Sequence, residues 1–269
     1  MNLPKRRWGD MAWTDFQSGD TAKWIAVVPL AATEQHGPHL PLSTDTEIMH
    51  GYLERVIGLL PEDLPATFLP VQTICLSPEH RDFPGTLTIS AETALRSWVE
   101  IGRNVARAGI RKIVFVSSHG GNNGLMEIAA RELRADFDML AVTTSFARFG
   151  YPDNLFSAQE IAHGVHGGDI ETSLMLAFRT DLVRQDKLAD FPSEAAQMEK
   201  DFVRLRTGRP AGFSWMAQDL NAHGVLGNAA NASAAKGEAA ARHGAKAFVE
   251  LLGDVREFSF DRLAKGPRG

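Results

Sequence analysis

The chain alternates short hydrophobic runs with longer segments in which hydrophobic residues recur every three or four positions. The first pattern is typical of buried strands and the second of amphipathic helices. The predicted strands are Trp24–Leu30, Phe68–Ile74, Ile113–Val116 and Met139–Thr144. The predicted helices are Thr46–Leu60, the segment from Ser90 to Gly109, Gly124–Ala135, Gly168–Arg179 and Ser233–Leu252. This alternation predicts an α/β fold with a mostly parallel sheet covered by helices.

Local signals refine these elements. Ser90 is an expected N-cap of its helix, and Gly109 is expected to end that helix in the left-handed conformation. Pro70 places the second strand at a sheet edge or a bulge, because proline has no N–H to donate. Two segments, 151–164 and 206–231, are expected to be long loops, which often bear function.

Composition places the chain among ordinary globular proteins. Of its 269 residues 44% are hydrophobic and 23% charged, which fits one domain over residues 1–269. A net charge of −5 gives no reason to expect a nucleic-acid or anionic-membrane partner. A single cysteine, Cys75, excludes an internal disulfide. No apolar segment of the roughly 20 residues needed to span a bilayer is present, and we expect a cytoplasmic protein.

Five side chains could bind metal ions. Each follows a predicted strand or begins a predicted helix: Glu34, His36, Asp45, His119 and Glu171. In open α/β sheets such positions converge on one crevice at the carboxyl ends of the strands. Mixed carboxylates and imidazoles suit Zn, Mn or Fe, and five ligands suit two ions. Taken singly, Asp45 could instead cap a helix, and Glu171 could simply favour a helix N-terminus.

Four stretches resemble the creatininase (creatinine amidohydrolase) family: Pro29–Thr46, Phe83–Thr86, Ser118–Asn122 and His166–Ser173. They stand in the family's order over about the first two thirds of the chain, and Gly224–Gly227 is similar to the family's C-terminal part. The resemblance implies a three-layer α/β/α fold, two metal ions per chain and a homohexamer. It also implies hydrolysis of a carbon–nitrogen bond in a small-molecule substrate. By position, Glu34 and His119 would hold one metal, His36 the other, and Asp45 would bridge them.

The chain departs from the creatininases proper at two places. Their metal-binding Glu shortly after the residue matching His119 has no counterpart at Gly121 or Asn122, so Glu171 is the natural substitute. Their tryptophan and acidic residues before the His matching His166 are replaced by Ala162–Val165. Creatinine is therefore not the expected substrate.

The remaining site residues are assigned by their setting. We expect His166 to protonate the departing nitrogen or stabilise the oxyanion. Gly120, Gly121 and Asn122 are expected to stabilise an oxyanion or orient substrate, with Ser77 and His80 lining the pocket. Alternatives on the same metal centre are hydrolysis of a lactone or a carbon–carbon bond in a sugar-like ketone, or a short-peptide peptidase. A scaffold with purely structural zinc is disfavoured, because structural zinc prefers Cys-rich sites.

Overall fold

The fold is built on a four-stranded parallel sheet, seen in a computed structural model that describes residues 3–264 and 266. The strand order is β2-β1-β3-β4. The strands are β1 (Ile25–Leu30), β2 (Ala66–Phe68), β3 (Lys112–Ser117) and β4 (Leu140–Ser145). Val27 of β1 stands opposite Val114 of β3, and Val114 stands opposite Val142 of β4. The prediction of a parallel central sheet is confirmed.

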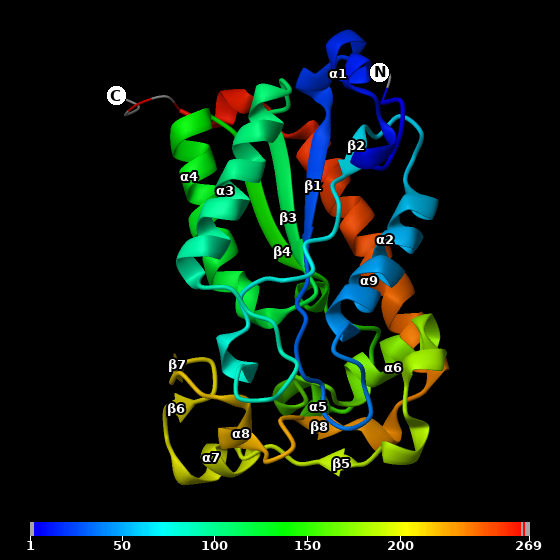
Figure 1. Cartoon of the computed structure of the whole chain (residues 1–269), viewed down its shortest axis with the longest axis vertical. Coiled ribbons are helices and arrows are strands. Elements are labelled where there is room, and N and C mark those ends of the chain that lie inside the picture. Colours follow the sequence, from blue (N-terminus) through cyan, green and yellow to red (C-terminus); the bar gives the residue numbers. More distant parts are fainter. Residues whose placement is uncertain (1–2, 265, 267–269) are drawn as a thin grey trace.

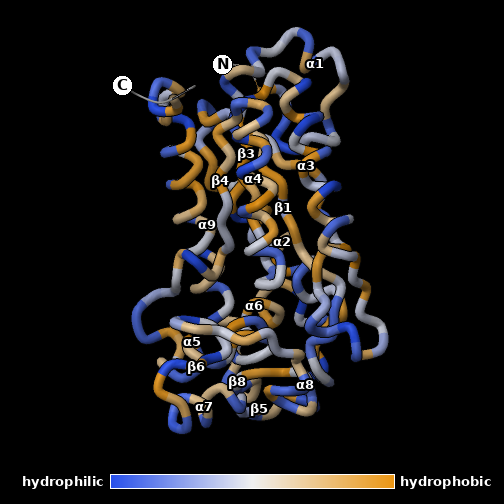
Figure 2. The backbone as a smooth tube through the Cα atoms, turned by 90° about the vertical axis from the view of Figure 1, so that its left-hand side faces the viewer, coloured by the Kyte–Doolittle hydropathy of each residue, from blue (hydrophilic) through white to orange (hydrophobic). Residues whose placement is uncertain are grey.

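Helices cover both faces of this sheet (Figure 1). Side chains alternate along a strand, so Val27 of β1 packs on one face with α2 (Thr44–Leu59) and α9 (Ala234–Glu257). Val28 packs on the other face with α3 (Ala91–Arg107) and α4 (Asn123–Phe137). In Figure 2 the hydrophobic residues concentrate along β1 and β3 between the helices. The three-layer α/β/α architecture is thus confirmed.

The expected helix signals are also present. The Ser90 hydroxyl accepts a hydrogen bond from the Thr93 N–H at 3.2 Å, which is the N-cap contact of α3. Gly109, just after α3, has φ +85°, the left-handed conformation that glycine adopts without strain. A Cβ at position 109 would also clash with the Thr21 hydroxyl, so a residue larger than glycine does not fit there without a local shift.

The second predicted strand, Phe68–Ile74, is wrong in its extent. The strand is Ala66–Phe68, and beyond it only Gln72 forms an isolated bridge, to Leu30. The physical reason is Pro70, which cannot donate a ladder hydrogen bond. The edge position predicted from that proline is confirmed.

A second region lies against the carboxyl ends of the strands, at the bottom of Figure 1. It contains four helices: α5 (Ala158–His163), α6 (Asp169–Phe178), α7 (Ala195–Asp201) and α8 (Ala217–Leu220). Four two-residue strands accompany them: β5 (Asp190–Phe191), β6 (Leu205–Arg206), β7 (Ala211–Gly212) and β8 (Gly227–Asn228). The two segments predicted as long loops, 151–164 and 206–231, therefore contain short helices and strands. The helix predicted at Gly168–Arg179 is present as α6.

Near the N-terminus, α1 (Trp13–Ser18) was not predicted. Within the part of the chain that the structure describes, no helix is both long and apolar enough to cross a membrane. The assignment of one domain to residues 1–269 stays a prediction, since residues 1–2, 265 and 267–269 lie outside the described residues.

Candidate metal centre

The five predicted ligands meet at the carboxyl ends of the strands. The loop after β1 carries Glu34 and His36, and Asp45 stands in the first turn of α2. His119 follows β3 directly, and Glu171 stands in the first turn of α6. Parallel strands end at the same edge of a sheet, so two strand ends and two helix N-termini deliver these side chains to one place.

The first three ligand atoms belong to Glu34, Asp45 and His119. His119 Nδ1 lies 3.2 Å from Glu34 Oε1 and 3.6 Å from Asp45 Oδ2. All three side chains are buried. Their ligand atoms lie within 4.8 Å of one another, close enough to share one ion.

A second group shares Asp45 with the first. His36 Nε2 lies 3.7 Å from Asp45 Oδ1 and 3.6 Å from Glu171 Oε2. The two carboxylate oxygens of Asp45 therefore face different groups, Oδ2 toward His119 and Oδ1 toward His36. This is the arrangement expected of a carboxylate that bridges two ions.

The polar atoms at the centre have no hydrogen-bond partners. Glu34 Oε1, His36 Nε2 and both carboxylate oxygens of Asp45 are buried and unpaired. Buried unpaired polar atoms are costly, and a native structure normally satisfies them with protein, water or an ion. His36 Nε2 lies 3.9 Å from Glu34 Oε1 and 3.7 Å from Asp45 Oδ1. Unpaired atoms at this spacing leave room for cations between them. The donor set, three carboxylates and two imidazoles, suits Zn, Mn or Fe.

Neighbouring groups hold these ligands in position. The Ser77 hydroxyl donates a hydrogen bond to Glu34 Oε2, which leaves Oε1 for the centre. His36 Nδ1 donates to the Glu34 carbonyl at 3.1 Å, and His119 Nε2 donates to the Leu76 carbonyl at 3.0 Å. Each bond directs the lone pair of the other ring nitrogen into the centre, as in many metal-binding histidines.

The electrostatics of the cation-free centre favour charged histidines. Burial opposes charge on His36, but Asp45, Glu171 and Glu34 outweigh it and raise its pKa to about 9. Burial likewise opposes charge on His119, while Glu34 and Asp45 raise its pKa to about 10. Burial raises the pKa of Glu171 to about 7. The centre thus holds protons where cations would bind.

His166 lies beside the centre. Its Nε2 donates to the Gln35 carbonyl at 2.7 Å, and its Nδ1 lies 3.6 Å from Glu34 Oε1. Its ring stands between those of His36 and His80, with centroid distances of 4.2 and 4.1 Å. Burial and the nearby His36 hold the pKa of His166 well below its usual range. With Glu34 and His36 it forms a third group that could hold an ion.

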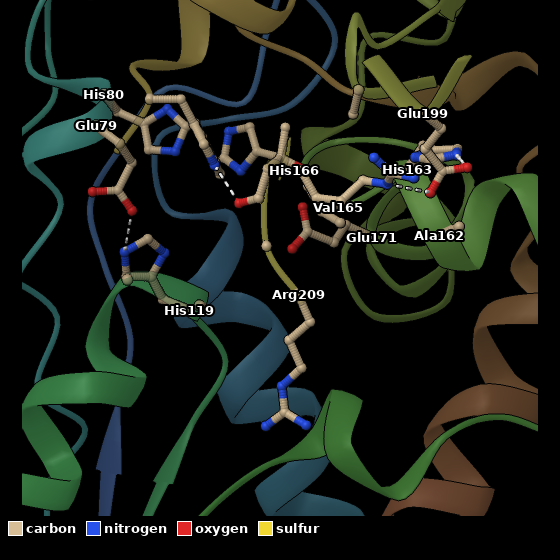
Figure 3. A pocket seen from close by; sticks show the side chains of 17 residues that line it. Glu79, His80, His119, Ala162, His163, Val165, His166, Glu171, Glu199 and Arg209 are labelled. Carbon is tan, nitrogen blue, oxygen red and sulfur yellow. Dashed lines mark hydrogen bonds and ion pairs between the residues drawn. The ribbon is translucent and has the colours of Figure 1, made fainter. Parts of the chain in front are cut away.

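A cavity of about 450 Å³ opens onto this centre (Figure 3). His119, His166 and Glu171 line it, together with His80 and the Gly120-Gly121 turn. A Cβ at Gly121 would clash with the His119 ring and the Glu79 carboxylate. Glycine there lets the backbone approach the site closely.

Ser77 and Asn122, which were expected to contact substrate, do not line this cavity. Ser77 is fully buried against Glu34. The Asn122 amide donates to the Ala31 carbonyl at 3.1 Å and accepts from the Leu76 N–H at 3.3 Å. Both side chains therefore hold the ligand loops in place instead of facing the cavity.

Sequence reasoning missed several cavity residues. Glu79 Oε1 lies 3.5 Å from His119 Nε2 (Figure 3), and its place beside His80 was a usable signal. Arg209 and Trp215 reach the cavity from the predicted 206–231 loop, where no motif marked them. Trp215 supplies the cavity with an indole ring, which Ala162–Val165 do not contain.

Residues 9–252 match the family model named Creatininase and described as creatinine amidohydrolase. A mycofactocin precursor peptide peptidase of Mycobacterium ulcerans is 33% identical over 91% of this chain and 88% of its own. A creatinine amidohydrolase of Pseudomonas putida is 30% identical over 68% of this chain and 76% of its own. A 3-dehydro-scyllo-inosose hydrolase of Thermotoga maritima is 21% identical over 90% and 79% of the two chains.

Solved structures share the fold. A crystal structure described as a putative creatinine amidohydrolase from Bacteroides fragilis has a TM-score of 0.78 at 21% identity, covering 96% of this chain and 99% of its own. A mutant creatininase described as the Zn-Zn type has a TM-score of 0.74 at 24% identity, covering 94% and 99%. A creatininase described as the Mn form has a TM-score of 0.72 at 24% identity, covering 94% and 100%.

Proposed function

This chain belongs to the creatininase family of hydrolases acting on carbon–nitrogen bonds, and we propose that it cleaves a small-molecule amide at a two-metal centre. The observation that carries the proposal is the placement of Asp45. Its two oxygens face two separate ligand groups, and neither oxygen accepts a hydrogen bond. A carboxylate in this position is suited to bridge two ions.

In the proposed centre Glu34 and His119 would hold one ion, His36 and Glu171 would hold the other, and Asp45 would be shared by both. Divalent ions there supply Lewis acidity toward the amide carbonyl and lower the pKa of water toward neutrality. Zn, Mn and Fe all suit this ligand set. The creatininase structures described as the Zn-Zn and Mn forms support Zn and Mn, because this chain shares their fold.

The residues around the centre then position and move protons. With its Nε2 donating to Gln35, His166 presents Nδ1 toward the centre as a proton acceptor. A proton taken from water there can pass to the amide nitrogen as the carbon–nitrogen bond breaks. The backbone of Gly120 and Gly121 borders the cavity, where its N–H groups can stabilise the developing oxyanion. The products are a carboxylic acid and an amine.

The substrate class we favour is a formamide, a cyclic amide or another small linear amide. A short-peptide peptidase is the second candidate, favoured by the M. ulcerans relative, which is similar over 91% of this chain. The alternative of lactone or carbon–carbon hydrolysis in a sugar-like ketone stays a prediction. The T. maritima relative is too distant, at 21% identity, to favour it. A homohexamer and a cytoplasmic location also stay predictions.

Activity on an amide panel tests the proposal. The protein is purified, stripped with a chelator, reloaded with Zn or Mn, and assayed on formamides, cyclic amides and short peptides. We expect turnover that disappears with the metal and returns on reloading. Equal rates in stripped and reloaded protein would contradict a metal-dependent reaction.

A further inference from the structure

One wall of the cavity, formed by residues 206–215, carries arginine. Arg206 lines the cavity from the end of β6, and Thr207 and Arg209 line it from the segment that joins β6 to β7. Trp215 lines it too, and its Nε1 donates to the Thr207 carbonyl at 3.0 Å, which ties the segment together. The hydrogen bond between Trp215 and Thr207 holds this wall together.

Arg206 is already occupied. Its guanidinium donates to the carbonyls of Phe202 and Leu205, each at 2.8 Å, and its Nε lies 3.7 Å from Glu199 Oε1. The second oxygen of Glu199 lies 3.5 Å from His163 Nε2. The Glu199 carboxylate therefore already has two basic neighbours, Arg206 and His163.

Arg209 differs from Arg206 in this respect. Within the described part of the chain it forms no hydrogen bond or ion pair. In Figure 3 its side chain extends alone, away from the labelled carboxylates of Glu79, Glu171 and Glu199. It does not serve as a counter-ion for the cluster of ligands. A guanidinium that lines a cavity with all its donors free is suited to bind a carboxylate through two parallel hydrogen bonds.

A second, more apolar cavity of about 310 Å³ adjoins the first. It shares His119, Gly120, Val165 and Glu171 with the first cavity. Aromatic and aliphatic side chains such as Phe146, Tyr151 and Leu174 line it, together with three serines and Asn123. An amide at the centre can thus place an apolar group in this cavity and an anionic group toward Arg209.

We propose that Arg209 selects amides that carry a carboxylate near the scissile bond, and that the adjoining cavity takes an apolar side chain. The inference rests on the proposed amide hydrolysis at the metal centre. It names a substrate class, N-acyl or N-formyl amino acids with apolar side chains, which shares its chemistry with the C-terminus of a short peptide. Arg209 is a specificity residue in this scheme and takes no part in bond cleavage.

The test compares a matched pair of probes, N-formyl-phenylalanine and N-formyl-phenylalaninamide, on the Zn-loaded protein. They differ only in the carboxylate. We expect kcat/KM to favour the carboxylate by at least about tenfold, since a charge-assisted pair is lost with the carboxamide. Arg209→Gln should remove the preference through KM, and Arg209→Lys should retain part of it. Arg204→Gln, an exposed arginine of the same region that does not line the cavity, is the control.

An unchanged preference in Arg209→Gln, or equal use of both probes by the wild type, would overturn the inference. If neither probe is hydrolysed, the proposed reaction on this class fails, and calorimetric binding of both probes then decides the role of Arg209. Tighter binding of the carboxylate that is lost in Arg209→Gln supports it. Equal binding of both probes by the wild type, or a difference that survives in Arg209→Gln, counts against it.

Discussion

The Nε2 atom of His36 lies 3.6 Å from Oε2 of Glu171, although one side chain follows the first strand and the other begins α6. His36 Nε2 has no hydrogen-bond partner, and the gap is too long for a direct bond. Glu171 Oε2 accepts a hydrogen bond from the Gly167 N–H at 2.6 Å, and a cation between the two side chains would satisfy His36 Nε2. The prediction that Glu171 replaces the ligand carboxylate missing from the turn after His119 is consistent with this position.

Glu171→Gln should therefore remove one ion and leave the other. Glu34, Asp45 and His119 do not depend on Glu171, so bound metal should fall from about two ions to about one per chain. Activity should fall by roughly 10²-fold or more. Glu199→Gln, which changes another cavity carboxylate outside the ligand groups, should keep both ions. Loss of both ions in Glu171→Gln would contradict two separate ligand groups.

Asp45 and His166 separate metal binding from proton transfer. Asp45→Ala should lose both ions and all activity, because each of the two proposed ion sites contains one of its oxygens. His166→Ala should keep most of the metal and lower kcat by roughly 10²-fold, the usual scale for a missing acid–base group. Elemental analysis and steady-state kinetics on both variants check this. Equal metal loss in the two variants would make His166 a ligand.

Ser77 distinguishes a ligand-holding role from substrate contact. Its hydroxyl donates to Glu34 and does not line the cavity. Ser77→Ala should weaken metal affinity by roughly tenfold, while KM at saturating metal stays unchanged. Competition with a chromogenic chelator measures the affinity, and Ser18→Ala, at an exposed hydroxyl that donates to the Thr14 carbonyl, is the control. A raised KM with unchanged metal affinity would restore the substrate-contact interpretation.

Metal binding should release protons near neutral pH. Without cations the pKa values of His36 and His119 are raised to about 9 and about 10, so both rings are protonated at pH 7. Ligands must lose their protons to bind, so the two rings should release about two protons per chain on loading, and Glu171, with a pKa of about 7, should release roughly half a proton more. Apparent metal affinity should rise with pH until about pH 10.

The same protons stabilise the metal-free fold. Because both pKa values are raised, their stabilisation is complete below about pH 6.5 and is lost as the pH rises through 9 to 10. Thermal melts of stripped protein, and zinc titration in weak buffer, measure the two effects. His243→Gln, at a histidine that bonds the Phe149 carbonyl, should behave as wild type. Zinc binding at pH 7 with no proton release would contradict the assignment.

Creatinine should be a poor substrate. A guanidine-containing ring needs carboxylate partners, but Glu199 already has His163 and Arg206 beside it. The charged side chain on the same cavity wall that has no partner among the described residues is Arg209, which is a cation. We expect kcat/KM for creatinine at least about 100-fold below that of the best amide, since two unmatched polar contacts reach that scale. Comparable turnover of creatinine would contradict this account of the cavity while leaving the metal centre intact.

The ligand positions could be read from the sequence because each stands at a strand end or in a first helical turn. His119 directly follows the buried strand around Ile113–Val116, and parallel strands deliver such residues to one edge. The strand at Phe68–Ile74 was misjudged because an apolar run does not show where its hydrogen bonds end. Pro70 carried that information.

The cavity wall could not be predicted in the same way. Strands of two residues such as β6 and β7 have no detectable period, so the region around Arg209 reads as a loop. The roles of Ser77 and Asn122 depend on which carbonyls and carboxylates come near them after folding. Which of the two arginines pairs with Glu199 is likewise set by the folded positions of Arg206 and Arg209, and Arg206 is the one that does.

Metal content tests the central claim most directly. After stripping and reloading with Zn or Mn, followed by removal of excess metal, elemental analysis should find about two ions per chain. Asp45→Ala treated in parallel should retain none. A wild-type protein that stays folded and metal-free at saturating Zn and Mn would contradict the two-metal centre.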